Sequence, residues 1–173
     1  PYFEFDTPDP LSIYASTKLE GERLTLDSSH ENLVCRVSML YGWNEVEERL
    51  NFVTWVIRSL EAGKEVRLLT DQRTSPTYAP HCAKVLLELA DRRALGIYHA
   101  SGPDCLTRYD FGMKVAEVFG LDSGRIKKAT MQDLQLTVRM PPCSCLDVNK
   151  TESELRLRMT STDEGLRLMR EEG

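Results

Sequence analysis

The chain has 173 residues, of which 41% are apolar and 28% are charged, as is usual for a soluble globular protein of one domain or slightly more. Its net charge of -5 argues against a nucleic-acid partner, because nucleic-acid-binding proteins carry basic patches. A membrane-spanning helix needs roughly 20 apolar residues. The longest apolar stretch, residues 52–57, is much shorter and contains Thr54, so we expect no membrane segment.

Five cysteines are dispersed along the sequence: Cys35, Cys82, Cys105, Cys143 and Cys145. An odd, scattered set of this kind favours reduced thiols, and we therefore predict a cytoplasmic location. Cys143 and Cys145 are closer together than the common zinc-binding spacings, and no histidine lies near them in the sequence. We interpret both as small apolar packing residues and expect no metal site.

Helical and strand-like patterns alternate along the chain, which predicts an α/β fold. Prolines within residues 1–10 predict an N-terminal loop, and Ser12 is suited to cap a helix that ends near Ser28. In chain order, the further predicted elements are a strand at 33–40, a loop at 41–48, a helix at 51–62, a strand at 66–69, a loop at 71–80, a helix at 81–92, a strand at 96–100, a helix at 107–119, a strand at 126–131, a loop at 133–147 and a charged, solvent-exposed helical segment at 151–173.

Tyr14 and Lys18 lie four residues apart at the start of the first predicted helix. Residues at positions i and i+4 share one face of a helix, so the phenol and the ammonium are expected one turn apart. A phenol is a poor proton donor at neutral pH, and a neighbouring positive charge improves it by stabilising the phenolate. The pair therefore predicts a general acid, with further Lys18 donors available for a cofactor hydroxyl. The structural alternative is a surface tyrosine beside a solvated lysine.

The residues around this pair resemble the catalytic helix of extended short-chain dehydrogenases/reductases. Residues 6–22 (DTPDPLSIYASTKLEGE) are similar to the family's D-x-P-x-P run followed by Y-x-x-[ST]-K-x-x-[GA]-E, and residues 36–42 (RVSMLYG) resemble its next strand, R-x-S-x-x-Y-G. Residues 71–77 (DQRTSPT) and 139–147 (RMPPCSCLD) resemble the D-Q-x-x-x-P-T and R-P-x-x-S-x-L-D segments of the dTDP-4-dehydrorhamnose reductases, with Met140 in place of a proline.

The resemblance implies an NAD(P)-dependent reduction of a nucleotide-linked 4-keto-sugar. Tyr14 would protonate the C4 oxygen of the sugar, and Lys18 would bind the nicotinamide ribose of NADP or NAD beside Tyr14. Ser38 and Met39 would contact the nicotinamide amide, largely through their backbone. These four residues are therefore the expected cofactor-binding set.

The resemblance also implies six substrate-binding residues: Trp43, Asn51, Phe52, Arg73, Thr77 and Arg139. Guanidinium groups bind phosphate through paired hydrogen bonds, so the two arginines are candidates for the substrate diphosphate. Salt bridges to Asp71 or Asp147 are the structural alternative for these arginines. For Trp43 the alternative is packing against its own loop, and the acidic insert at 45–48 departs from the family pattern.

Three further residues, Arg36, His81 and His99, are interpreted as structural, because each adjoins an apolar strand or helix. Some relatives use magnesium at a dimer interface. A magnesium ion and a homodimer are therefore open possibilities for this chain, and the sequence maps no ligand for the ion.

The sequence contains no G-x-G-x-x-G or G-x-x-G-x-x-G motif, the Gly-rich turn that holds a dinucleotide pyrophosphate. We therefore expect residues 1–173 to be the C-terminal portion of a reductase that lacks its N-terminal dinucleotide-binding half and is inactive alone. Residues 11–42 would supply the catalytic helix and the following core strand of a Rossmann-like fold. Residues 43–173 would form mainly a small substrate-binding α/β subdomain, with a core strand returning near 96–100.

Two other functions remain open. A nucleotide-sugar epimerase or dehydratase of the same family usually carries R-x-F-x-x-V-x-D where this chain has residues 73–80, which favours the reductase. A non-catalytic regulatory subunit is the alternative from another class, because the regulatory subunit of methionine adenosyltransferase is similar in the same segments. The intact Tyr14 and Lys18 speak against that reading.

Overall fold

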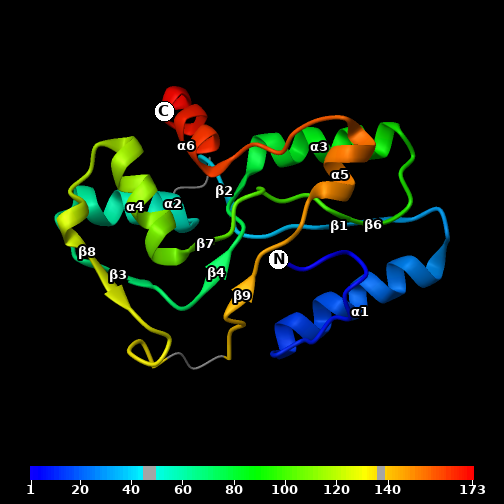
Figure 1. Cartoon of the computed structure of the whole chain (residues 1–173), viewed down its shortest axis with the longest axis horizontal. Coiled ribbons are helices and arrows are strands. Elements are labelled where there is room, and N and C mark those ends of the chain that lie inside the picture. The colour runs from blue at the N-terminus through cyan, green and yellow to red at the C-terminus, as the bar shows by residue number, and fades with distance from the viewer. Residues whose placement is uncertain (45–49, 136–138) are drawn as a thin grey trace.

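The computed structural model describes residues 1–44, 50–135 and 139–173 (Figure 1). The acidic stretch 45–48 of the predicted loop lies outside the described residues. The elements are α1 (Ile13–Ser28), β1 (Leu33–Arg36), β2 (Leu40–Tyr41), α2 (Phe52–Glu61), β3 (Val66–Leu69), β4 (Arg73–Thr74), β5 (Thr77–Tyr78), α3 (Ala79–Asp91), β6 (Gly96–His99), β7 (Leu106–Thr107), α4 (Arg108–Phe119), η1 (Ser123–Arg125), β8 (Ile126–Ala129), β9 (Cys143–Ser144), α5 (Asn149–Leu155) and α6 (Thr162–Glu172). Within this part of the chain, no helix is both long and apolar enough to cross a membrane.

Local capping explains where the helices begin. The Ser12 hydroxyl accepts a hydrogen bond from the backbone N–H of Ala15 at 3.2 Å, which confirms the predicted cap of α1. Asn51 and Thr54 form a reciprocal capping box at the start of α2. Thr107 caps α4, and Gly120 ends that helix in the left-handed conformation that glycine adopts without a steric penalty.

The short strands form four small sheets among the described residues, which lie at the two ends of the molecule and between them. At one end β1 pairs in parallel with β6, with α1 on one side and α3 and α5 on the other (Figure 1). At the other end β3 pairs in parallel with β8 beside α2 and α4. Between them β4 lies between antiparallel β7 and parallel β9, and β2 pairs in parallel with β5. The predicted α/β class is confirmed.

Two predicted boundaries are wrong because tertiary pairing overrides the apolar run. Strand 33–40 stops pairing with β6 at Arg36, and Met39 has a φ of 41°, a turn that leads the chain into β2. The predicted loop at 71–80 contains β4 and β5. It also contains the first turn of α3, where Pro80 is tolerated because an N–H at this position has no helical partner.

The C-terminal segment differs most from the prediction of an exposed helix. It forms two helices, and the side chains of Leu166 and Met169 in α6 are fully buried. They belong to the larger core cluster together with Val53 of α2 and Phe111 of α4. α6 is therefore part of the core, and only its outer face is charged. A second core cluster joins α3, β6 and α5.

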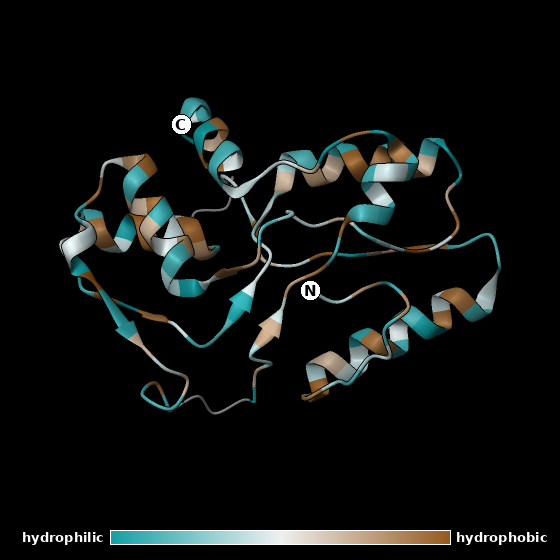
Figure 2. Ribbon diagram, in the orientation of Figure 1, coloured by the Kyte–Doolittle hydropathy of each residue, from teal (hydrophilic) through white to brown (hydrophobic). Residues whose placement is uncertain are grey.

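Helix α1 buries none of its residues. Its apolar side chains at Ile13, Tyr14 and Leu24 are 85%, 72% and 61% exposed. Figure 2 shows hydrophobic residues spaced along α1. In α2 and α4, by contrast, several apolar side chains are buried in the larger core cluster. Among the α-helices of the described residues, the one that carries the predicted catalytic pair is thus the one without a buried residue.

Candidate functional site

A cavity lies where the parallel strands β1 and β6 end, and it is larger than a second cavity beside residue 39. Its volume is about 600 Å³. Arg36 and His99, the paired last residues of these strands, contribute to its wall, as do Lys18 of α1 and Ser38. Ligands of open α/β sheets bind beyond the carboxyl ends of the strands, so this is the expected place for a site.

Tyr14 and Lys18 lie together on α1 at the edge of this cavity. The Lys18 ammonium nitrogen is 5.8 Å from the centre of the Tyr14 ring. Lys18 lines the cavity, and the Tyr14 ring is open to solvent just outside it. Within the described residues, no side chain hydrogen-bonds the Tyr14 hydroxyl and no carboxylate pairs with Lys18. Both groups are therefore available to a ligand.

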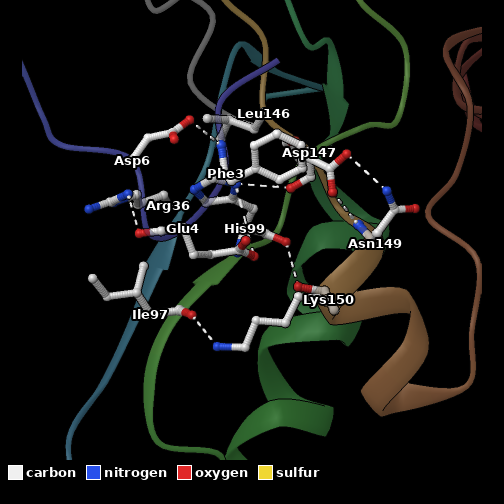
Figure 3. Close-up of polar contacts among 12 residues, drawn as sticks. Phe3, Glu4, Asp6, Arg36, Ile97, His99, Leu146, Asp147, Asn149 and Lys150 are labelled. Carbon is white, nitrogen blue, oxygen red and sulfur yellow. Dashed lines mark hydrogen bonds and ion pairs between the residues drawn. The ribbon is translucent and has the colours of Figure 1, made fainter.

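A partly buried ion pair lines the cavity. Arg36 donates two hydrogen bonds to the Glu22 carboxylate, at 2.6 and 2.8 Å. It donates a third, at 3.4 Å, to the backbone oxygen of Glu4 (Figure 3). A bidentate pair of this kind fixes both side chains. The predicted structural role of Arg36 is confirmed, and its partner is Glu22, the residue that the helix spacing would equally have paired with Lys18.

His99 is fully buried beneath the same segment. Its ring Nδ1 lies 2.9 Å from the backbone oxygen of Asp147, and its backbone N–H donates to the Glu4 carboxylate at 3.1 Å (Figure 3). A carbonyl only accepts, so Nδ1 carries the proton. Burial lowers the pKa of His99, because an imidazolium would lose its hydration. His99 therefore fastens the N-terminal segment to β6, in agreement with its predicted structural role.

Ser38 and Thr77 support the turn after β1. The Ser38 hydroxyl lies 3.0 Å from the Thr74 hydroxyl, and the Thr77 hydroxyl donates to the backbone oxygen of Ser38. Ser38 lines the larger cavity, whereas Thr77 is almost completely buried and lines neither cavity. The structure thus places Ser38 at the site and Thr77 behind it.

A second cavity of about 380 Å³ opens on the other side of residues 38–39. The predicted residues Met39, Asn51 and Phe52 line it. The polar atoms of Asn51 are occupied, because its side-chain oxygen caps α2 and its amide nitrogen donates to the Gly42 oxygen at 2.7 Å. Phe52 offers its ring to the cavity with Trp55 beside it.

Arg108 is a partly buried positive group of the second cavity, and it was not among the predicted site residues. Its guanidinium donates to the Gln72 side-chain oxygen at 3.0 Å and lies 5.5 Å from the centre of the Phe52 ring. No carboxylate pairs with it among the described residues, and burial lowers its pKa. The sequence did contain a signal for this residue. An arginine in the first turn of a helix is unfavourable with respect to the helix dipole, which indicates that the arginine has another role.

Trp43, Arg73 and Arg139 do not gather in one place. The Trp43 indole donates to the Met169 oxygen at 2.6 Å and packs edge-on against Phe119, away from both cavities. Arg73 is exposed and donates to the Cys105 oxygen at 3.4 Å. Arg139 lines the larger cavity and forms no salt bridge within the described part of the chain.

The expectation of reduced, merely packing cysteines is wrong for one pair. Cys105 and Cys145 form a disulfide, with their Cα atoms 5.5 Å apart. They are 40 residues apart in the sequence, so no local pattern could indicate the pairing. Cys143 remains a free thiol, and its sulfur lies within 4.8 Å of the other two. In the described ranges, this trio is the one group of three side chains close enough to share a metal ion, and no acidic cluster suited to magnesium accompanies it.

The residues present suit one end of a nicotinamide nucleotide. Lys18 has three donors and no acidic partner in the described residues, which fits the hydroxyls of a ribose. The pyrophosphate would need a Gly-rich turn at a helix start, and the sequence has none. The chain therefore has groups suited to the nicotinamide ribose, and its sequence lacks the Gly-rich turn that would hold the pyrophosphate.

A Tyr–Lys pair at the carboxyl edge of parallel strands, next to a second cavity that contains Arg108, places the chain in the class of Rossmann-related α/β folds. The comparisons with known proteins make this specific. The family model described as "RmlD substrate binding domain" matches residues 1–172, and the chain belongs to this family.

Curated relatives fall into two kinds. The chain is 36% identical over 166 residues to "Probable low-salt glycan biosynthesis reductase Agl14" of Haloferax volcanii, covering 95% of this chain and 55% of that protein. It is 35% identical over 159 residues to "Methionine adenosyltransferase 2 subunit beta" of Xenopus tropicalis, covering 88% of this chain and 47% of that protein. The chain thus spans about half the length of these relatives.

The structural comparison gives the same family. The crystal structure of dTDP-4-dehydrorhamnose reductase from Bacillus anthracis in complex with NADP superimposes with a TM-score of 0.91 at 26% identity, covering 99% of this chain and 59% of that one. The resemblance to the dTDP-4-dehydrorhamnose reductases, read from four short motifs, is confirmed.

Proposed function

We propose that this chain is the substrate-binding part of an NAD(P)-dependent reductase that acts on a nucleotide-linked 4-keto-sugar. The observation that carries the proposal is the pairing of an exposed Tyr14 with Lys18 at the edge of the larger cavity. The family membership and the NADP complex of the Bacillus anthracis reductase support it.

In the proposed reaction the carbonyl at C4 becomes an alcohol. The nicotinamide cofactor, when bound, supplies the hydride. The Tyr14 hydroxyl donates the proton to the C4 oxygen, and the Lys18 ammonium stabilises the phenolate that remains. Because Tyr14 is 72% exposed, water can return its proton before the next cycle. Lys18 would also bind a ribose hydroxyl of the cofactor, and Ser38 and Met39 would border the nicotinamide.

We assign the nucleotide end of the substrate to the second cavity. Arg108 provides an uncompensated positive charge there, and Phe52 and Trp55 provide aromatic faces against which a base can pack. Arg139 borders the first cavity and suits the diphosphate between the two sites. Arg73 would have to leave the Cys105 oxygen to reach a phosphate, which makes it the weaker candidate of the two predicted arginines.

The experiment is a turnover assay on the complete gene product with dTDP-4-dehydrorhamnose and NADPH or NADH. Tyr14→Phe should lower kcat on the order of 10²–10⁴-fold and leave nucleotide affinity nearly unchanged, because the substitution removes only the hydroxyl that donates the proton. Tyr109→Phe is the matched control, since Tyr109 also lies beside a lysine, with the Lys128 nitrogen 5.1 Å from its ring, and lines neither cavity.

An unchanged rate in Tyr14→Phe would remove Tyr14 from the mechanism. Net consumption of NAD(P)H distinguishes a reductase from an epimerase or dehydratase of the same family, because those reactions regenerate the cofactor. Product formation without net consumption would therefore favour the second chemistry.

A non-catalytic subunit is the second candidate, and the 35% identity to a methionine adenosyltransferase subunit favours it. The two candidates differ in what they require of Tyr14. Binding to a methionine adenosyltransferase catalytic subunit, unaffected by Tyr14→Phe and accompanied by no turnover of any keto-sugar nucleotide, would establish the subunit role instead.

A further inference from the structure

Three cysteines meet at the border of the larger cavity. The sulfurs of Cys105, Cys143 and Cys145 all lie within 4.8 Å of one another, although only two of them are bonded. Cys143 is half-buried and lines the cavity, whereas Cys145 is fully buried. Cys105 is also half-buried, so Cys143 is the half-buried member of the trio that is a free thiol.

The other two cysteines of the chain provide a contrast. Cys35 and Cys82 lie at the second core cluster. Burial raises the pKa of the Cys35 thiol to about 11 and also raises that of Cys82. A thiol must lose its proton to attack a disulfide, so these two are poorly suited to exchange.

Strand geometry decides which partners are possible within the trio. Cys143 lies in β9 and Cys145 comes directly after that strand, so an extended backbone would place both side chains on the same side. Their Cα atoms are then about 6.6 Å apart, at the upper limit for a disulfide. Cys105 comes from a different segment, just before β7, and faces both. It can therefore bond with either of the other two cysteines.

We propose that Cys105, Cys143 and Cys145 form a thiol–disulfide exchange site in which Cys105 switches between two partners. The Cys143 thiolate attacks the sulfur of Cys105. The Cys105–Cys143 bond forms as the Cys105–Cys145 bond breaks, and Cys145 takes up the proton that Cys143 lost. The rearrangement involves no net oxidation, so the structure needs to supply no oxidant.

The three-cysteine site is linked to residues that line the larger cavity. Cys143 is in register with Arg73 across β4 and β9, and the Cys105 oxygen accepts the Arg73 guanidinium. Arg139 and Ser144, on either side of Cys143, line the cavity. Exchange therefore changes how residues 139–145 are tied to the segment before β7. The consequence for ligand binding rests on the proposed function, whereas the exchange itself does not.

The primary test maps disulfides in the full chain by differential alkylation and mass spectrometry in buffers of reduced and oxidised glutathione. Wild-type protein should contain Cys105–Cys145 as the main bond and Cys105–Cys143 as a minor one. Cys145→Ser should convert the chain to Cys105–Cys143. In Cys143→Ser, reduction of Cys105–Cys145 by glutathione should slow by about tenfold, because the route through the accessible thiol is lost. Cys35→Ser is the matched control and should behave as wild type.

Three results would overturn the proposal. The first is the absence of a detectable Cys105–Cys143 bond in the wild-type chain at any glutathione ratio. This result does not depend on the folding of a variant. The second is a Cys143→Ser variant that is reduced at the wild-type rate. The third is stoichiometric binding of Zn²⁺ by the reduced chain that all three Cys→Ser variants abolish, which would make the trio a metal site.

A separate measurement addresses the consequence. The affinity for dTDP, measured by calorimetry, should differ between oxidised and reduced wild-type protein and should not respond to reduction in Cys105→Ser. If dTDP does not bind in either state, the proposed function fails while the disulfide map still decides the exchange.

Discussion

Substituting Leu166 tests the most consequential packing feature of the fold, the burial of α6. Leu166 is fully buried in the larger core cluster. Its neighbour Gly165 shows how closely α6 approaches: a Cβ there would lie 2.2 Å from the Tyr41 hydroxyl and 2.9 Å from the Tyr78 Cβ. Surroundings this tight cannot collapse freely around a smaller side chain, so a cavity remains after truncation.

Leu166→Ala should therefore lower the free energy of unfolding by about 3 kcal/mol, near the lower half of the range for fully buried leucines. For a chain of this size that corresponds to a fall in Tm of roughly 6–12 °C. Leu168→Ala is the matched control on the same helix, because Leu168 is 38% exposed. We expect it to cost less than about 1 kcal/mol.

Urea unfolding followed by circular dichroism measures both values. Leucine and alanine have similar helix propensities, so the difference between the two variants reports burial and not helix stability. Equal, small effects of the two substitutions would refute the burial of α6. They would instead support the solvent-exposed helix that the charged sequence of this segment predicts.

Two further predictions concern the site. Burial lowers the pKa of His99 below its unfolded value of 6.5, and that of His81 in the same direction, so the folded state binds fewer protons than the unfolded state as the pH falls. The free energy of unfolding should thus be highest above pH 6.5 and should decline below it. Urea titrations at pH 8 and pH 5.5 measure this decline, and His99→Gln should make it smaller. An equal decline in the variant and the wild type would show that His99 is not responsible. Arg108→Met should weaken dTDP binding by about 1.5–3 kcal/mol in calorimetry, because it removes a charged hydrogen-bond donor while preserving the apolar stem. Arg125→Met, which removes an exposed arginine bonded to Asp122 and the Gly63 oxygen, should leave dTDP affinity unchanged, and equal effects of the two variants would exclude Arg108 from the site.

The local features of the fold were predictable because their causes lie within a few residues. The Ser12 and Thr107 caps, the apolar spacing of α2 and the short run of β3 each depend on neighbours along the chain. Tyr14 and Lys18 belong to the same group, since helix geometry alone places them one turn apart.

The composition of the site was predictable only in part, because a cavity is made by segments that are distant in sequence. Lys18, Ser38 and Arg139 meet at one cavity, while Met39 and Phe52 meet at another. Trp43, an unusual aromatic in an acidic loop, packs against Phe119 of α4 and hydrogen-bonds the Met169 oxygen of α6. Its sequence context is the same in either arrangement, so no sequence pattern could have chosen between them.

The sequence by itself determined the α/β class, the helix that carries the Tyr–Lys pair and the family, because periodicity, capping and short motifs are properties of contiguous residues. Only the tertiary structure decided that α6 is buried, that Arg108 faces a cavity without a counter-charge and that Cys105 bonds with Cys145. Each of these depends on which remote segments become neighbours, and that is decided by the packing of the whole core rather than by any single stretch of chain.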